Sequence, residues 1–290
     1  MPLWKPTDVN DVHLWLKSED ITGSTSWTDS SGKGNTMSHT APPSVSATLK
    51  NSKKMAAFNG TSQYLKLIDG GVQPTDVGSG EFFIGIFVKM PSSISSTVSL
   101  FAKDANASEF DFRFNGSREL IMSMEGGTGS AGTNTSVIKH ETGTIPNASE
   151  YYFLFVKRSG TTVTVGHSDS ANSNNTTSAT NDNDIDANVE CYLGARESTG
   201  GVVEKFWNGE IGEIFIIHND PTDTDHDAFE GYLAFKFDQD RLEAAHPYKF
   251  GPPTSCHCVA GATLGTDFLA STHGDAYEVG QELNIRDERG

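Results

Sequence analysis

Residues 207–217 read Trp-Asn-Gly-Glu-Ile-Gly-Glu-Ile-Phe-Ile-Ile, and residues 229–236 read Phe-Glu-Gly-Tyr-Leu-Ala-Phe-Lys. The first run is rich in β-branched and aromatic residues, which predicts a buried strand entered through a turn. The second run has apolar residues at helical spacing, after an Asp/Thr-rich run at 222–227 that can cap a helix. A proline pair follows at 252–253. A strand, a short helix and a proline stop together predict the end of a domain.

Apolar and aromatic runs recur at short intervals upstream, and most of them predict antiparallel strands. Residues 110–114 alternate cleanly, which places three phenylalanines on one face and Asp111 and Arg113 on the other, as a half-exposed sheet requires. We expect these rings in the core, because a core-facing ring offers no free face to a sugar. The other predicted strands lie at 82–89, 98–102, 120–124, 151–157 and 161–165.

Motifs rich in tryptophan, glycine and turn residues mark the first 65 positions. They are Trp4-Lys-Pro, Leu14-Trp-Leu-Lys-Ser-Glu-Asp, Trp27-Thr-Asp-Ser-Ser-Gly-Lys-Gly-Asn and Ala57-Phe-Asn-Gly-Thr-Ser-Gln-Tyr-Leu. Together with the strand and helix near the end, they resemble the laminin-G-like, concanavalin A-like lectin and glucanase sandwiches. Many phage virion proteins and some bacterial surface proteins carry such domains.

The resemblance covers roughly residues 1–253. It implies an all-β fold, an antiparallel β-sandwich of the jelly-roll, concanavalin A-like type, with one short C-terminal helix. The motifs belong to turns and core faces, and ligand sites in this family vary on loops, so the resemblance supplies no catalytic residue. The predicted organisation is this sandwich at 1–253 and an irregular C-terminal extension at 254–290.

The C-terminal extension differs in composition from the sandwich. From Gly251 onward, six acidic residues against two basic ones leave a charge of −4, with only short apolar patches. Such a segment buries too little to fold alone, so we expect it to wrap back on the sandwich or to order against a neighbouring subunit. We predict that it attaches the protein to a larger assembly, and a loose end without a role is the alternative.

The formal net charge of −17 opposes direct binding to nucleic acid or to an anionic membrane. No apolar run approaches the roughly 20 residues of a membrane span. The N-terminus also lacks the basic-then-apolar layout of a secretory signal. We therefore expect no nucleic-acid partner and no membrane association. Assembly in a host cytoplasm, as for a virion component, fits this layout better than export.

The three cysteines, Cys191, Cys256 and Cys258, cannot all pair within one chain. Cys256 and Cys258 flank His257, and His273 follows, but zinc sites usually place two or more residues between paired cysteines. We expect ordinary thiols here, and the role of Cys256 and Cys258 stays open.

Residues 168–188 contain no Lys, Arg or aromatic residue, which predicts a solvated hairpin tip or loop. Within this segment, Asp182, Asp184 and Asp186 lie two apart, as in the first half of a calcium loop. The second half is missing, because no Gly follows at the turn and no Glu stands at the closing position. Calcium at these three residues is the one cofactor that the sequence offers, and a plain acidic loop is the alternative.

Glu210 and Glu213 invite a glycosidase interpretation, since retaining enzymes place two carboxylates about 5 Å apart. Catalytic partners on one strand must share a face and so lie an even number of residues apart. The odd spacing predicts that these two glutamates point to opposite faces, so we expect no hydrolase activity.

We predict a non-enzymatic structural protein of a phage virion, a capsid decoration protein at the virion surface, with glycan binding as a second role. The expected partners are other virion proteins, either the major capsid protein or the tail, and a cell-surface glycan. We expect a homo-oligomer, with a trimer favoured. The alternatives are a tail fibre or receptor-binding adhesin, and a stand-alone carbohydrate-binding module of a bacterial surface protein. Such a module needs an aromatic- and Asn/Asp-lined groove at the loop ends. The sequence assigns no catalytic or glycan-binding residue, and it leaves the host and the glycan open.

Overall fold

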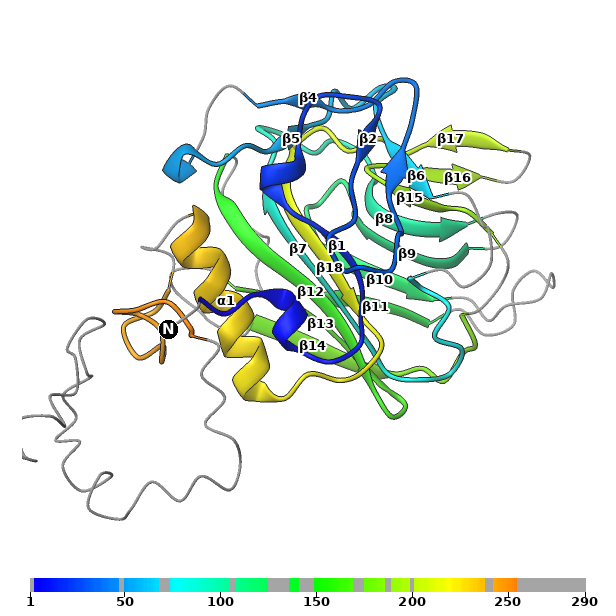
Figure 1. The fold of residues 1–290 in the computed structure, drawn as a ribbon. Helices are drawn as coiled ribbons and strands as arrows, with labels where there is room; N and C mark the ends of the chain where they lie inside the picture. Colours follow the sequence, from blue (N-terminus) through cyan, green and yellow to red (C-terminus); the bar gives the residue numbers. More distant parts are fainter. Residues whose placement is uncertain are drawn as a thin grey trace, which may run out of the picture.

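The computed structural model describes residues 3–46, 50–67, 74–104, 108–124, 136–140, 149–168, 175–185, 189–198, 201–237 and 242–254. Within these ranges, two antiparallel sheets of eight strands each form a β-sandwich, and one α-helix follows the last strand (Figure 1). The predicted all-β antiparallel sandwich with a C-terminal helix is confirmed. The predicted extension at 254–290 lies outside the described residues except for Thr254.

The first sheet, which we call the helix-side sheet, has the order β14-β13-β12-β7-β18-β5-β4, and β1 pairs with β18 beside this path. The predicted strand at 82–89 is β7, which lies at the centre of the sheet. The strands in this order are Asn175–Thr180, Thr162–Ser168, Tyr151–Ser159, Phe82–Lys89, Glu210–Ile217, Ala56–Ala57 and Ser44–Val45, and β1 is Val12–Leu16.

The second sheet, which we call the far sheet, has the order β11-β10-β9-β8-β15-β6-β3-β2. A separate hairpin joins β16 (Arg196–Ser198) to β17 (Val202–Glu204). Short 3-10 helices lie at Pro6–Asp8, Ser18–Asp20 and Lys50–Ser52 (η1 to η3). The strands of the far sheet in this order are Ser136–His140, Leu120–Met124, Ser108–Phe114, Val98–Asp104, Cys191–Leu193, Leu65–Leu67, Met37–Ser38 and Ser26–Trp27.

The main core lies between the sheets. Phe110, Phe112 and Phe114 are fully buried there, as predicted. The expectation of a half-exposed outer face is wrong at Asp111, which is fully buried. Ser99 Oγ donates a hydrogen bond to Asp111 at 2.7 Å, and Arg113 and, from β16, Arg196 approach the same carboxylate within 3.5 Å. A buried carboxylate is tolerated here because it is hydrogen-bonded and paired.

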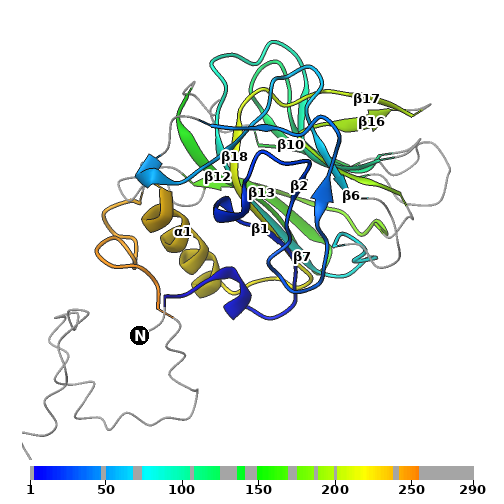
Figure 2. The same ribbon diagram turned by 45° about the horizontal axis from the view of Figure 1, so that its top comes forward.

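A second apolar cluster covers the opposite face of the helix-side sheet. Helix α1 (Asp223–Phe237) lies across this face, beside the N-terminal segment (Figures 1 and 2). Thr222 and Asp225 cap the helix reciprocally, which confirms the predicted start. Phe229, Leu233 and Phe237 of α1 pack on the rings of Phe83, Phe87, Phe153 and Phe215. Strands β7, β12 and β18 are therefore buried on both faces, which explains their continuous apolar runs.

The described C-terminal segment, residues 242–254, lies beside the N-terminus. Trp4 N donates to Pro253 O at 3.0 Å, and Leu3 forms a β-bridge with Thr254. This pairing brings both ends of the described chain against α1. No helix in the described ranges has the length and apolar character needed to cross a membrane.

The segment at 168–188 differs in part from the predicted solvated loop. Residues 175–180 form β14, an edge strand that pairs with β13. An edge strand is held by backbone hydrogen bonds on one side only, so polar side chains such as Thr176 and Ser178 can face solvent. The absence of large apolar residues therefore did not exclude a strand.

Candidate functional site

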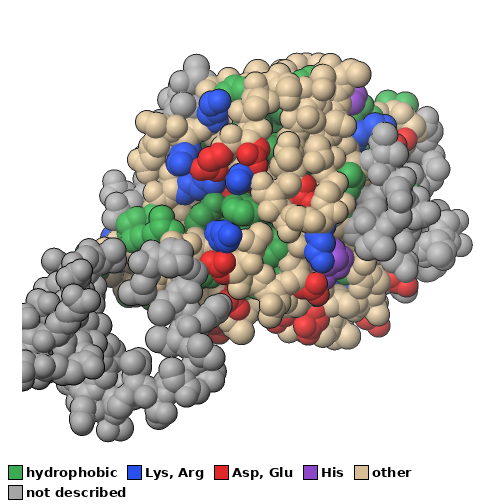
Figure 3. All heavy atoms as spheres, in the orientation of Figure 1, with side chains coloured by type: hydrophobic (Ala, Val, Ile, Leu, Met, Phe, Trp, Pro, Cys, Tyr) green, Lys and Arg blue, Asp and Glu red, His purple; other side chains and the backbone are tan. Residues whose placement is uncertain are grey.

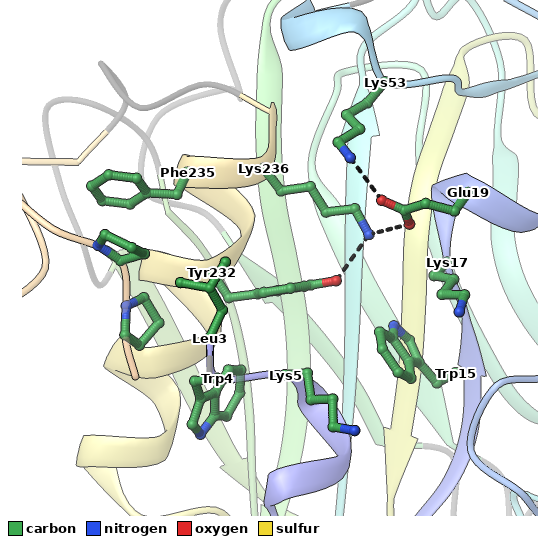
Figure 4. Close-up of a pocket in the computed structure, with 12 residues that line it drawn as sticks. Leu3, Trp4, Lys5, Trp15, Lys17, Glu19, Lys53, Tyr232, Phe235 and Lys236 are labelled. Atoms are coloured by element: carbon green, nitrogen blue, oxygen red, sulfur yellow. Dashed lines mark hydrogen bonds and ion pairs between the residues drawn. The ribbon is translucent and has the colours of Figure 1, made fainter. Parts of the chain in front are cut away.

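A pocket of about 510 Å³ opens where the C-terminal half of α1 meets the N-terminal segment and η2 (Figure 4). We call it the α1 pocket. Its aromatic lining consists of Trp4, Trp15, Tyr232 and Phe235. Its charged lining consists of Lys5, Lys17, Lys53, Lys236 and Glu19. Rings and ammonium groups thus surround one hollow, which is the usual make-up of a small-molecule site.

The aromatic wall is held rigidly by the cluster under α1. The Trp4 ring packs edge-on against Phe229 at 4.9 Å between centroids, and it also contacts Tyr232. Trp15 is only 7% exposed, whereas Phe235 is half-buried and belongs to neither core cluster. Phe235 therefore offers a ring to a ligand without being needed for the core.

Three residues of the pocket lining form hydrogen bonds to one buried carboxylate, that of Glu213 in β18. Glu213 is fully buried and accepts hydrogen bonds from Trp15 Nε1 at 2.5 Å, from the Tyr232 hydroxyl at 2.8 Å and from Lys236 Nζ at 2.6 Å. Desolvation raises the pKa of Glu213, although the charge of Lys236 opposes the rise. Burial and the neighbouring Glu213 likewise raise the pKa of Tyr232. With three donors around it, the Glu213 carboxylate has no free face for a ligand.

Glu19 also lines the pocket. Its carboxylate lies 2.7 Å from Lys236 Nζ and 2.9 Å from Lys53 Nζ (Figure 4). Desolvation disfavours the charged form of Glu19, but hydrogen bonds and charge from Lys236, helped by Lys53, lower its pKa to about 2. The Glu19 carboxylate therefore stays ionised at any pH near neutral.

The α1 pocket is positively charged within an acidic chain. Four lysines face one glutamate in the lining, while the whole chain carries −17. Lys5 is exposed and has no ion pair within the described ranges, and Lys17 Nζ lies 5.4 Å from the centroid of the Trp15 ring. Basic and apolar side chains lie side by side on this face of the molecule (Figure 3). An anionic group would thus be attracted to this face in particular.

Glu210 and Glu213 lie on the same face of β18, so the prediction of opposite faces is wrong. The pairing with β7 shifts register between Ile211 and Glu213, which places Glu210 opposite Lys89 and Glu213 opposite Phe87. This bulge adds one residue, so an odd spacing becomes an even one. Glu210 forms an ion pair with Lys89 at 2.9 Å.

The calcium candidates are only partly described. Asp182 and Asp184 are exposed and alternate with buried Asn181 and Asn183, while Asp186 lies outside the described residues. Asn183 N donates to Asn181 Oδ1 at 3.0 Å, so an amide side chain helps to hold this turn. Calcium binding at the three aspartates stays a prediction.

The cysteines give no site in the described part of the chain. Cys191 is a buried free thiol whose Sγ lies 3.1 Å from Thr75 Oγ1. Cys256 and Cys258, with His257 and His273, lie outside the described residues.

Sequence analysis did not assign any residue of the α1 pocket to a site. Trp4, Trp15 and Glu19 were part of the quoted motifs, but only as markers of the fold. Trp15 and Glu213 are 198 positions apart in the sequence, and nothing in either motif indicates that they meet. The one available signal was the concentration of aromatic and lysine residues near both ends of the sandwich.

Comparison with known proteins shows the fold and no closer relationship. The sequence matches no family model and no curated protein. The structure is similar to the binding domain of paraclostridial mosquitocidal protein 1, with a TM-score of 0.55, 10% identity and 76% of this chain covered. It is similar to a structure of botulinum neurotoxin type C, whose cell entry depends on interaction with two ganglioside molecules, with a TM-score of 0.53, 10% identity and 74% of this chain covered.

A third similar structure is Trypanosoma rangeli sialidase in complex with sialic acid, with a TM-score of 0.51, 11% identity and 75% of this chain covered. The match spans 51% and 50% of the two toxin chains and 32% of the sialidase. The fold of this chain is thus similar to that of the β-sandwich parts of these three structures.

Proposed function

We propose that this chain is a non-enzymatic carbohydrate-binding protein and that the α1 pocket binds an oligosaccharide carrying an acidic group. The observation that carries the proposal is the combination of a half-buried ring, Phe235, with four lysines in the lining of one hollow. A sugar ring stacks its C–H face on an aromatic ring, and a carboxylate or sulfate pairs with ammonium groups. The chain as a whole carries −17, so a cluster of four lysines is a distinctive place for an anionic ligand.

The structural neighbours support the ligand class. One is described with gangliosides and another with sialic acid, and both ligands are acidic sugars or carry them. These ligands belong to the neighbours, and at about one-tenth identity the pocket of this chain has to be argued from its own residues.

The carboxylates of the pocket favour binding over hydrolysis. A glycosidase needs one carboxyl group that donates a proton and another that attacks or activates water. Glu213 is fully buried under Trp15, Tyr232 and Lys236, so it cannot reach a substrate. Glu19 is held ionised by two lysines and lacks a partner acid in the described lining.

The site of action in our proposal follows the sequence resemblance, with a phage particle as the location. There the sandwich would face outward, as a capsid decoration protein or as part of a tail adhesin, and a homo-oligomer would place several α1 pockets on one surface. Several sites on one assembly raise avidity without new contacts. A cut after Pro253 tests the anchoring role of residues 254–290: the full chain should bind particles that lack it, and the shortened chain should not.

A glycan array tests the carbohydrate-binding proposal. Wild-type protein should bind sialylated, uronic or sulfated glycans and give at most weak signals on their neutral parents. Phe235→Ala should reduce the signal about tenfold, which corresponds to about 1.4 kcal/mol. Phe250→Ala is the matched control, because Phe250 is 92% exposed and lies outside the pocket lining. Absence of binding to every glycan, or an equal loss in both variants, would refute the proposal.

A further inference from the structure

Three potential metal ligands meet on the N-terminal half of α1. His226, Asp227 and Glu230 each offer one ligand atom, and these atoms lie within 4.8 Å of one another. His226 and Glu230 are four residues apart, so they share one face of the helix. Asp227 is the half-buried member, and the other two are buried. The cluster therefore lies under the surface with one carboxylate near solvent.

Two further segments hold Glu230 in this arrangement. Ser168 Oγ, at the end of β13, donates a hydrogen bond to Glu230 Oε1. His246 Nε2, from the C-terminal segment, lies 3.1 Å from Glu230 Oε2. Side chains behind a ligating carboxylate fix its orientation in metal sites, and such supporting groups matter for affinity.

No permanent cation balances Glu230 in the described part of the chain. Its ion-pair contacts there are with His226 at 3.4 Å and His246 at 3.1 Å, and both side chains are imidazoles. A buried carboxylate is costly unless it is hydrogen-bonded or paired with a cation.

The His226 ring also has an unused polar atom. Nε2 is buried and has no hydrogen-bond partner among the described residues. The His226 side chain is only 9% exposed, so bulk water does not replace that partner. A buried nitrogen without a partner loses its hydration without compensation. The ring lines a hollow of about 330 Å³ between α1 and strands β12 to β14, and the charged side chains in that lining are Lys157, Asp223 and Asp227.

We propose that His226, Asp227 and Glu230 bind a divalent transition-metal ion of the zinc type, with Ser168 and His246 positioning Glu230. Imidazole nitrogen with carboxylate oxygen is a common zinc donor set, with bonds of about 2.0–2.2 Å. Calcium prefers oxygen ligands alone, so a histidine at the centre argues against it. Two carboxylates offset the charge of the ion, and one ligand atom of each residue lies within 4.8 Å of the others.

The site, if metal-bound, has a structural consequence for the C-terminal segment. His246 and Pro253 belong to the same described segment, and Pro253 lines the α1 pocket. Fixing Glu230 also fixes its contact with His246, so the ion would fasten this segment to α1. The metal site is nevertheless independent of the carbohydrate-binding proposal.

Isothermal titration of chelator-treated, tag-free full-length protein with ZnCl₂ tests the metal site. We expect one ion per chain in the wild type. Binding should be about a hundredfold weaker in His226→Gln and at least about tenfold weaker in Asp227→Asn. Glu150→Gln is the control, because it removes one negative charge from an exposed side chain outside both the cluster and the hollow. Circular dichroism confirms that each variant is folded.

Two results would overturn the proposal. The first is a folded wild type that binds neither Zn²⁺ nor Co²⁺ at micromolar concentrations. The second is zinc binding that Asp227→Asn and Glu150→Gln leave equally strong, which would place the ion elsewhere. In either case the cluster is a metal-free hydrogen-bond network that ties α1 to the C-terminal segment.

Discussion

Helix α1 covers two buried glutamates whose surroundings differ. Glu213 lies beneath the C-terminal half of the helix and accepts hydrogen bonds from Lys236, Tyr232 and Trp15. Glu230 lies on the N-terminal half and contacts His226, His246 and Ser168. The first carboxylate is balanced by a permanent ammonium group, whereas the contacts of the second within the described ranges are two imidazoles and a hydroxyl. The comparison indicates that the Glu213 cluster already contains its balancing cation, whereas the Glu230 cluster can accept one.

The same contrast separates the roles of the two ends of the helix. The ammonium-balanced end opens into the α1 pocket, where Lys236 and the aromatic rings form a stable wall for a ligand. The imidazole-lined end is closed over by the C-terminal segment through His246. In our proposals, the first end binds a ligand and the second stabilises the fold.

The largest expected effect comes from removing the ammonium group at the Glu213 end. Lys236→Met leaves Glu213 buried without its cation, which should cost about 3–5 kcal/mol of unfolding free energy. Urea unfolding measures the loss. Lys53→Met is the control, since its ion pair with Glu19 is largely exposed and worth at most about 1 kcal/mol. Equal losses in the two variants would show that the Glu213 cluster is not the buried ion pair described here.

The next effect concerns the Glu230 end and depends on zinc. Zinc at a hundred times its dissociation constant should raise the unfolding free energy by about 2.7 kcal/mol, because it binds only the folded chain. Calorimetry with and without a chelator measures the difference, and Asp227→Asn should abolish it. If a chelator left the melting temperature of the zinc-loaded wild type unchanged, the proposed difference between Glu213 and Glu230 would be contradicted.

A smaller effect is expected where the C-terminal segment touches α1. A Cβ at Gly231 would lie 2.7 Å from Tyr248 Cβ, so Gly231→Ala must displace the segment that carries His246. Overpacking costs about 1–3 kcal/mol, against a gain of about 1 kcal/mol in helix propensity. Thermal unfolding should show a net loss of up to about 2 kcal/mol. Gly251→Ala is the control, since open space surrounds that position, and stabilisation by Gly231→Ala would contradict the close contact.

The smallest effect is the pH dependence contributed by Glu19. Its folded pKa of about 2 lies below the ordinary value of 4.5, so its ion pairs stabilise the fold above about pH 4.5. This contribution is lost as the pH falls through 2. Because the side chain is 42% exposed, solvent screening keeps the contribution below about 1 kcal/mol. The stability difference between wild type and Glu19→Gln should be constant from pH 8 to 5 and shrink toward pH 2. A difference that grows on acidification would contradict the assignment.

The fold was predictable because its strands carry local signals. The run at 82–89 became β7 without a shift, and the apolar spacing at Phe229, Leu233 and Phe237 correctly marked the face of α1 that packs on the sheet. Asp111 was predicted on the outer face, but its burial depends on the hairpin β16–β17, which the strand itself does not reveal. The bulge between Ile211 and Glu213 likewise follows from pairing with β7.

The candidate sites were harder to predict because each joins distant parts of the chain. The α1 pocket brings Trp15 and Glu19 to Lys236 and Tyr232, which no local pattern indicates. The spacing of His226 and Glu230 was visible as a helical pair, whereas the contact of Glu230 with His246 requires the fold of residues 242–254.

The most direct test of the account is calorimetric titration with the acidic glycan that gives the strongest array signal, and with the same glycan stripped of its acidic group. We expect the acidic form to bind the wild type at least about tenfold more tightly than the neutral form. Lys53→Ala should remove most of that preference, and Lys54→Ala should keep it, since Lys54 is exposed and outside the pocket lining. Equal affinity for the two glycans, or an unchanged preference in Lys53→Ala, would contradict the α1 pocket as a site for acidic sugars.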